Sequence, residues 1–248
     1  MIELKDEGII ISNNSFQENF FITQVFSRKY GLVSGLTRKR KKSSNFNIGD
    51  FVFFRWKSRL SEQLGFLHVD VINSILPFIL QVTYKIYMVN ALSSLIKILL
   101  QEKDPHEVIF ETVSKILVNL TKHDDKFLHY KNYLLFELTL TKDLGYGFDW
   151  SRCSVTNSKE ELFYISPKTG NIVTKEVGYK YADKLFIIPA FMLKQDQPCF
   201  KNDIYNGFHL MEHIFKKYVL TSNKVELPQM RKNLLDLTDQ ENTLCYIE

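Results

Sequence analysis

The sequence predicts an α+β protein of two parts, a small five-stranded β-barrel followed by a mainly helical region. Apolar residues alternate with polar ones through roughly the first 75 residues, and from Val82 their spacing becomes helical. The 248 residues are 45% hydrophobic, which is enough apolar material to build a buried core. The length fits one large domain or two smaller ones.

Five runs of strand character precede the helical part, and turn residues separate them. They are residues 8–11, 20–26, 31–36, 51–60 and 64–72. Five short strands in this length suit a barrel of the oligonucleotide-binding (OB) type, because a β-sandwich needs more strands. We therefore predict an OB-type nucleic-acid-binding domain at residues 1–78 and a helical domain at residues 79–248.

Helix signals divide the second part. The first helix is expected at residues 82–101, and Asp104 to Glu107 predicts the start of the second, with a cap residue, proline at the first helical position and Glu at the third. That helix should reach Lys122, and the third should begin at Asp124 or Asp125 and end at Gly145.

A β-containing lobe is predicted at about residues 150–181, where the helical pattern stops. Residues 161–165 and 171–176 have strand character on either side of a turn at residues 166–171. Helices are expected again at residues 202–221 and 228–237.

Positive charge is concentrated between Arg28 and Arg59. Ten basic residues and one acid, Asp50, give this segment a charge of +9, and because the whole chain carries +4 the remainder carries −5. Such asymmetry indicates a polyanionic partner. The ten basic residues are Arg28, Lys29, Arg38, Lys39, Arg40, Lys41, Lys42, Arg55, Lys57 and Arg59.

Two patterns within this segment favour nucleic acid as the partner. The run from Arg38 to Lys42 looks like a cationic loop that would neutralise phosphates, although a solvated loop or a localisation signal has the same composition. Strand alternation places Phe51, Phe53, Arg55, Lys57 and Arg59 on one face, opposite a core face of Val52, Phe54, Trp56 and Leu60. Aromatics that stack bases beside cations that follow the backbone suit single strands. The alternative is that the two phenylalanines pack under a loop.

Other features place the chain in a reducing compartment. Cys153, Cys199 and Cys245 are far apart and form no C-x-x-C pair, which argues against a disulfide framework. We find neither a secretory signal at the N-terminus nor a membrane-spanning apolar run. A cytoplasmic, nucleoid-associated protein without membrane contact is expected.

One motif would indicate an enzyme. His209, Glu212 and His213 match H-x-x-E-H, in which two histidines one helical turn apart can bind zinc. The alternative is an amphipathic helix with partly exposed histidines, since the remaining residues supply no patterned third ligand. Phosphate-loop, dinucleotide and nucleophile-elbow motifs are missing from the sequence. We therefore predict a binding protein without catalytic residues, metal or cofactor.

Several segments in order resemble the RecO family of bacterial recombination mediators and DNA-annealing proteins. The segments are Asp6-Glu-Gly-Ile-Ile-Ile11, Phe26-Ser-Arg-Lys-Tyr-Gly31, Asn47-Ile-Gly-Asp-Phe51, Trp56-Lys-Ser-Arg-Leu60 with Leu64-Gly65, Leu144-Gly-Tyr-Gly-Phe-Asp149, Ser151-Arg-Cys-Ser-Val-Thr156, Ser166-Pro-Lys-Thr-Gly170 and Leu227-Pro228 with Arg231-Lys232. Their order and spacing are more specific than any one of them.

The resemblance implies an N-terminal OB fold, a helical C-terminal domain, and DNA repair as the function. It implies binding of single- and double-stranded DNA, strand annealing, and loading of the recombinase RecA onto strands coated with single-strand-binding protein (SSB). The implied partners are RecR, possibly RecF, and the acidic C-terminal tail of SSB, for which Lys216 and Lys217 are candidate contacts. An OB-type factor for structured RNA or the ribosome would show the same cationic segment and is the alternative function.

The sequence departs from the family at a zinc site that some members build from two C-x-x-C pairs. Here the first pair reads Cys153-Ser-Val-Thr156, and the second would fall near Thr174 and Val177. A zinc-ribbon-like lobe without its zinc ligands is therefore expected. Apolar packing of Phe163, Ile165, Ile172 and Val173 should hold it together.

Overall fold

The structure is a computed structural model that describes residues 2–38, 46–60, 63–220 and 226–244, with side chains to residue 238. It divides into two compact units. Unit 1 contains residues 1–123 and 228–234, and unit 2 contains residues 124–227 and 235–248. Each unit is described by itself.

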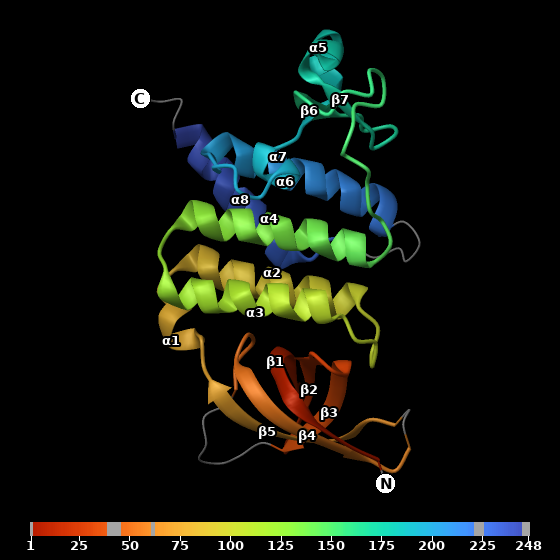
Figure 1. Ribbon diagram of the computed structural model, residues 1–248. Coiled ribbons are helices and arrows are strands. Elements are labelled where there is room, and N and C mark those ends of the chain that lie inside the picture. The colour runs from red at the N-terminus through yellow and green to blue at the C-terminus, as the bar shows by residue number, and fades with distance from the viewer. Residues whose placement is uncertain (1, 39–45, 61–62, 221–225, 245–248) are drawn as a thin grey trace. The chain divides into compact units, whose positions relative to one another are not determined.

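Unit 1 begins with a closed five-stranded barrel, as predicted (Figure 1). Its strands are β1 (Ile2–Phe16), β2 (Phe20–Ser27), β3 (Gly31–Arg38), β4 (Phe51–Ser58) and β5 (Gly65–Asn73). They follow the order β1-β2-β3-β5-β4, with β1 antiparallel to both β2 and β4, and β3 parallel to β5. The order and the closure are those of an OB barrel.

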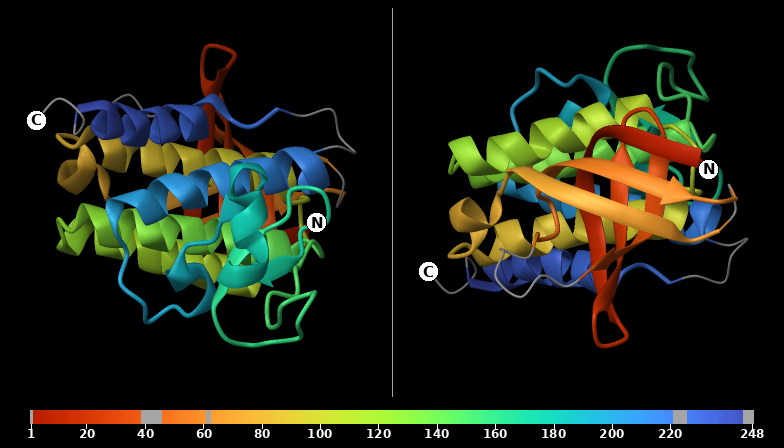
Figure 2. Two further views of the ribbon diagram at one scale, coloured as in Figure 1. Left: turned by 90° about the horizontal axis from the view of Figure 1, so that it is seen from above. Right: turned by 90° about the horizontal axis from the view of Figure 1, so that it is seen from below.

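Strand β1 is longer than predicted at both ends. The polar stretch 12–15, expected to be a connection, continues the strand and pairs with β2 as a long hairpin (Figure 2). Its side chains have partners, because Ser12 donates to Gln24 at 2.7 Å and Thr23 donates to Asn13 at 2.9 Å. Pairing between polar side chains therefore replaces apolar alternation as the reason for the strand.

The barrel core confirms the predicted alternation of β4. Val52, Phe54 and Trp56 are buried, and they pack with apolar residues of the other strands. Leu60 was predicted on the same face but is 59% exposed, because β4 ends at Ser58 before reaching it. The other buried core members are Ile10, Val25, Val33, Leu67 and Val69.

The single acid of the cationic segment, Asp50, is buried. Its carboxylate accepts hydrogen bonds from the Asn47 amide at 2.7 Å, the Ser74 hydroxyl at 2.7 Å and the Ile75 amide at 3.2 Å. Asp50 therefore joins the start of β4 to the chain that leaves β5. The carboxylate is not on the surface that a polyanion would meet.

Three helices follow the barrel in unit 1, namely α1 (Leu76–Ile79), α2 (Thr83–Leu99) and α3 (Glu107–Lys122). Both α2 and α3 lie beside one end of the barrel (Figure 1). The predicted start of α3 is wrong, because the helix begins at Glu107 and its cap residue His106 makes no side-chain cap bond. Asp104 instead lies 3.5 Å from the ring of His106, in a loop that pairs with β3.

Lys85 of α2 is 2% exposed and stabilises the end of α3. Its ammonium group donates to the carbonyls of Leu120 at 2.9 Å and His123 at 3.1 Å. The last carbonyls of a helix have no partner within the helix, and a cation there also meets the negative end of the helix dipole. The buried lysine thus has a structural role within unit 1.

Unit 2 is built on α4 (Lys126–Asp143), which packs on α7 (Lys201–Ile214), with the short helix α6 (Ala190–Leu193) nearby. The predicted cap of α4 is confirmed at Asp125, whose carboxylate accepts from the Leu128 amide at 3.0 Å. The turn of π-helix η2 (Phe215–Val219) continues α7. Helix α8 (Gln229–Leu244) runs beyond its predicted end, and its residues belong partly to each unit.

The lobe of unit 2 is a three-stranded sheet in the order β7-β6-β8. Its elements are β6 (Leu162–Ile165), β7 (Ile172–Thr174), α5 (Lys175–Gly178), the 3-10 helix η1 (Tyr179–Lys184) and β8 (Phe186–Ile187). Ile165 and Ile172 pair in register and are buried as predicted. Phe163 and Val173 are only half-buried, and Tyr164 occupies the interior instead, against Gly178.

Candidate nucleic-acid interface

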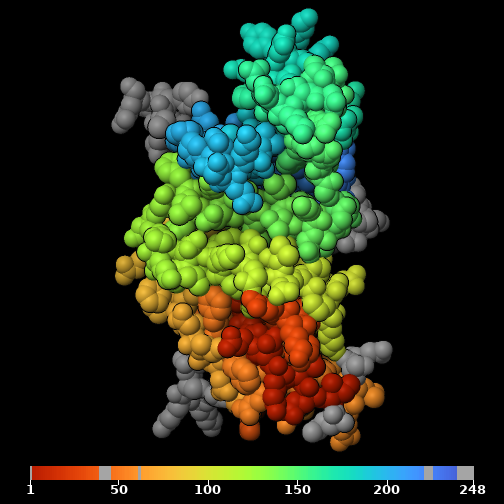
Figure 3. Space-filling model, in the orientation of Figure 1, coloured from red at the N-terminus to blue at the C-terminus, as the bar shows by residue number. Residues whose placement is uncertain are grey.

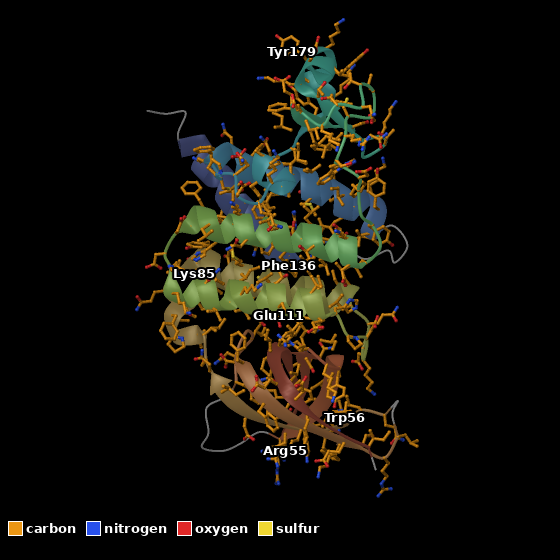
Figure 4. The ribbon with its side chains drawn as sticks, viewed as in Figure 1. Arg55, Trp56, Lys85, Glu111, Phe136 and Tyr179 are labelled. Carbon is orange, nitrogen blue, oxygen red and sulfur yellow. The ribbon has the colours of Figure 1, made fainter. Side chains whose placement is uncertain are left out.

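The outer side of strands β1, β4 and β5 carries the aromatic and cationic residues predicted for β4. Phe53 is 38% exposed, and the side chains of Arg55 and Lys57 are about half exposed. Figure 4 shows Arg55 on the outer side of the barrel strands. Neighbouring strands add Glu3 opposite Lys57 and His68 opposite Arg55. We call this surface the outer barrel face, and it consists of Glu3, Lys5, Glu7, Phe53, Arg55, Lys57, Phe66, His68 and Asp70.

Carboxylates pair with the cations of the outer barrel face. Glu3 lies 3.1 Å from Lys5 and 3.3 Å from Lys57, and Asp70 lies 3.7 Å from Arg55. The pKa of Glu3 is lowered, chiefly by the hydrogen bond from Lys5 and further by Lys57. Counting Asp, Glu, Lys and Arg alone, three acids balance three bases on this face. A phosphate that binds here must displace a carboxylate from its cation. The alternation of residues in the sequence could not indicate these carboxylate partners.

Arg28 is engaged within unit 1. Its guanidinium pairs with Glu111, lies 4.0 Å from Glu107, and sits 5.9 Å from the ring centroid of Phe110. All three partners belong to α3, so Arg28 connects the end of β2 to that helix. The two carboxylates balance the charge of Arg28. A phosphate would therefore have to displace them in order to bind Arg28.

Two residues of the family-like segment Asp6 to Ile11 have a structural role near the turn between β2 and β3. Asp6 accepts from the Ser27 hydroxyl at 2.5 Å and from the Lys29 amide at 3.2 Å, and the Ser27 hydroxyl accepts from the Tyr30 amide at 3.2 Å. A side chain on Gly8 would lie 2.4 Å from Val25, so a glycine is required for the close approach of β2. Asp6 thus holds the turn that presents Lys29 and Tyr30.

The remaining predicted cations lie at strand ends. Arg38 ends β3 and Arg59 follows β4, and both are exposed. Residues Lys39, Arg40, Lys41 and Lys42 lie outside the described residues. The space-filling view shows residues near the N-terminus, in red, at the surface of the barrel (Figure 3). Glu3 and Glu7 of β1 are exposed, so their carboxylates contribute to the surface that a ligand meets.

The two lysines predicted to contact a partner tail already have contacts inside unit 2. Lys216 pairs with Glu212 one helical turn away, and Lys217 donates to the carbonyls of Pro167 and Lys168. Lys217 therefore connects η2 to the turn between β6 and β7. Both lysines have roles within unit 2 that need no external ligand.

The H-x-x-E-H residues do not converge on a common centre. His213 contacts the Pro167 carbonyl at 2.9 Å through Nε2, Glu212 pairs with Lys216, and the His209 ring packs on Tyr205 with centroids 4.2 Å apart. Among the described residues, no three His, Cys, Asp or Glu side chains gather where they could hold a metal ion. Each of the three side chains therefore has a contact of its own within unit 2.

Residues 153, 156, 174 and 177 of the lobe have contacts of their own. Cys153 is buried, its thiol accepts from the Thr156 amide at 3.4 Å, and the Thr174 hydroxyl caps α5 through the Val177 amide. One thiol, two threonines and a valine do not form a zinc donor set. Burial opposes ionisation of Cys153, yet hydrogen bonds from Thr156 and nearby backbone amides lower its pKa to about 7.

A second cationic and aromatic cluster, in unit 2, was not found from the sequence. Phe127 is 45% exposed beside Lys126, Lys201 and Ile204, which line a small hollow with it. The Lys126 ammonium lies 5.7 Å from the centroid of the Tyr130 ring. These residues come from the starts of α4 and α7, so only the packing of the two helices brings them together.

The architecture defines the class of protein, an OB-barrel protein with a helical C-terminal part and a small β lobe. Two family models match the chain, "Recombination protein O N terminal" at residues 1–75 and "Recombination protein O C terminal" at residues 81–220. In the part of the chain that the structure describes, we find no helix with the length and apolar character needed to span a bilayer.

Relatives of known name agree with the family models. The chain is 35% identical to the DNA repair protein RecO of Rickettsia canadensis, over 90% of this chain and 92% of that protein. It is 34% identical to RecO of Rickettsia akari and 32% identical to RecO of Rickettsia bellii, over 90% and 93% of this chain and 93% and 94% of theirs. The chain belongs to the RecO family, which supports a role in DNA repair and recombination.

Proposed function

We propose that this protein is a recombination mediator that acts by binding, without catalysis. It binds single- and double-stranded DNA, anneals complementary strands and helps to load RecA onto SSB-coated single strands. The site of this action is the cytoplasmic nucleoid. Membership of the RecO family supports the proposal, and the outer barrel face supplies a surface for it.

The observation that carries the proposal is the exposed side of β4. Phe53, Arg55 and Lys57 follow each other at every second position of one strand, which places them in a row with a spacing of about 6.8 Å. A row with one aromatic ring and two cations can stack a base and follow a phosphate backbone at once. Neither contact depends strongly on base sequence.

Annealing follows from charge neutralisation. Two DNA strands repel each other through their phosphates, and cations that replace condensed counterions reduce this repulsion while releasing ions to the solvent. The bases must stay available for pairing, so a surface that contacts mainly the backbone suits this role better than one that reads base edges. No bond is made or broken, and no cofactor is required.

An annealing assay tests the proposal directly. Two complementary oligonucleotides are coated with SSB, and duplex formation is followed with and without the full-length protein. We expect clear acceleration, whereas an unchanged rate with SSB-coated strands would contradict the mediator role. Competition between single-stranded DNA and RNA of equal length then separates a DNA-repair function from binding to RNA.

Charge reversal tests the cationic segment. Replacing Arg40, Lys41 and Lys42 by Glu should lower DNA affinity and flatten its dependence on salt, because each lost phosphate contact removes about 0.9 from the slope. The matched control replaces Lys159, Lys180 and Lys184, exposed residues of the lobe, and alters the net charge equally. Equal effects of the two triple variants would assign the result to overall charge.

The acidic tail of SSB is the proposed protein ligand of unit 2, with RecR and possibly RecF as further partners. The cluster of Lys126, Phe127 and Lys201 is the better candidate for the tail, because it combines two cations with an exposed ring. A fluorescent peptide of the tail should bind the wild-type protein and lose most of its affinity to Lys126→Glu. The control is Lys216→Glu. A larger loss of peptide affinity with that variant would favour Lys216, the contact predicted from the sequence, over the cluster around Phe127.

A further inference from the structure

A pocket of about 360 Å³ opens at the rim of the barrel in unit 1, apart from the outer barrel face. Its apolar lining comes from the first residues of β1, from the turn between β2 and β3, from β4 and from the loop between α2 and α3. Ile2 and Leu4 contribute apolar surface to the wall, Trp56 lies beneath it with 1% of its surface exposed, and Lys29 and Lys103 carry the charge. Small-molecule sites begin at about this volume, with an apolar lining and a few polar groups.

Each cation of this rim pocket lies against an aromatic ring. The Lys103 ammonium is 4.7 Å from the centroid of Trp56, and the Lys29 ammonium is 5.2 Å from that of Tyr30. Trp56 is held in place, because its indole N–H donates to the Ser34 carbonyl at 2.9 Å. The two positive charges therefore flank an apolar space with fixed walls, which suits a flat apolar group that carries negative charge on both sides.

The backbone at Lys103 is strained. Its φ is +61°, a left-handed conformation that a glycine or asparagine would adopt more cheaply. The surrounding chain maintains it, because the Lys103 amide donates to the Leu32 carbonyl at 2.9 Å and Glu102 forms a β-bridge with Leu32. Strain of this kind persists where neighbouring structure imposes it, and it gathers at binding and catalytic sites. A residue with a long cationic side chain is thus held over the pocket.

The rim pocket and the outer barrel face share the paired ends of β1 and β4. Leu4 of β1 pairs with Trp56 of β4 and points to the pocket, while the adjacent pair of Glu3 and Lys57 points outward. The two surfaces thus lie on opposite faces of the ribbon that the paired ends of β1 and β4 form.

We propose that the rim pocket accepts one unstacked base of single-stranded DNA, with Lys29 and Lys103 binding the phosphates on either side. This inference rests on the proposed DNA-binding function and adds a site to it. A base in a duplex cannot enter without being unpaired and flipped out of the stack, which costs free energy. The pocket therefore makes the protein favour single strands, whereas the outer barrel face accepts both forms.

Substitution of Lys103 separates this site from general phosphate binding. Lys103→Gly removes the ammonium and also relieves the left-handed backbone, so the fold is preserved. With full-length protein, we expect affinity for a single-stranded oligonucleotide to fall about tenfold and affinity for the matching duplex to fall less than about twofold. The control is Lys115→Ala, an exposed lysine of α3 outside the pocket, which should change neither affinity.

Three outcomes would overturn the pocket assignment. Equal losses for single strand and duplex would make Lys103 an ordinary phosphate contact, and unchanged affinities would place DNA elsewhere. Loss of binding to an acidic peptide, with DNA affinity intact, would assign the pocket to a protein ligand. Wild-type protein that binds neither form of DNA would instead refute the proposed function itself, so the two failures are distinguishable.

A photocrosslink locates the base. A strand with a single 5-iodouracil is bound to the wild-type protein and irradiated, and the crosslinked peptide is identified by mass spectrometry. We expect attachment at Tyr30, which lines the rim pocket and is partly exposed. Attachment confined to Phe53 or Phe66 of the outer barrel face would overturn the proposal while leaving DNA binding in place.

Discussion

Two carboxylates on the outer barrel face should weaken DNA binding. Glu3 pairs with Lys5 and Lys57, and Asp70 pairs with Arg55. The combined change Glu3→Gln and Asp70→Asn leaves the shape of each side chain almost unaltered and removes only the negative charge. Because the cations then have no carboxylate to exchange, we expect the variant to bind DNA more tightly than the wild type.

The size of the effect on DNA affinity follows from the number of cationic side chains that become free to contact phosphate. If Arg55 and Lys57 each gain a phosphate contact, the slope of log affinity against log salt steepens by about 1.8, since each contact contributes about 0.9. Between about 50 and 200 mM salt, a fourfold change, the advantage of the variant over the wild type should shrink by about twelvefold. The effect is therefore largest at low salt.

Fluorescence anisotropy with a labelled oligonucleotide over a salt series measures both quantities. A matched control neutralises Glu160 and Asp183, exposed acids of the lobe, and alters the net charge equally. An unchanged slope in the Glu3 and Asp70 variant would refute the reasoning, because the outer barrel face would then not contact phosphates. A similar gain in the control would attribute the effect to net charge.

Three further predictions concern stability and ionisation. Lys85→Met should lower the free energy of unfolding by about 3 kcal/mol, because two carbonyls at the end of α3 lose a charged donor, and a denaturant titration measures this. Gly31→Ala should cost more than about 2 kcal/mol in the same assay, since its φ is +65° and the new Cβ would lie 2.0 Å from a backbone oxygen of the loop between α2 and α3. Thiolate absorbance near pH 7 should titrate in the wild type and disappear in Cys153→Ser, whereas Cys199, with its pKa raised to about 12 mainly by burial, stays protonated. Because folding lowers the pKa of Cys153, the thiolate should contribute its full stabilisation above about pH 8.5 and lose it as the pH falls through 7. A Cys153→Ser variant whose free energy of unfolding has the same pH profile as the wild type would contradict this.

Part of the candidate interface could be predicted from alternation alone. The side chains of Phe53, Arg55 and Lys57 are exposed because a strand turns every second residue to the same side, and β4 has enough apolar partners to specify which side faces the core. The pairing of Arg55 with Asp70 could not be predicted, because it depends on the register between two strands. Arg28 shows the same limit, since its carboxylate partners lie on a helix distant in sequence.

The rim pocket lies beyond sequence reasoning for a related reason. The sequence analysis assigned Lys103 no role, and only the β-bridge between Glu102 and Leu32 shows that its loop pairs with the barrel and places the side chain over Trp56. Local patterns report the preferences of a few neighbouring residues, whereas this arrangement is imposed by contacts between distant segments.

The sequence by itself determined the class of fold, the five strands, most of the helices and the family, because periodicity and the order of motifs are properties of the chain alone. Tertiary structure alone decided which charges are balanced. Asp50, the single acid of the cationic segment, became a buried acceptor, whereas Glu3 became a surface partner of two lysines. The physical reason is that electrostatic interaction depends on distance and solvent exposure, and folding sets both.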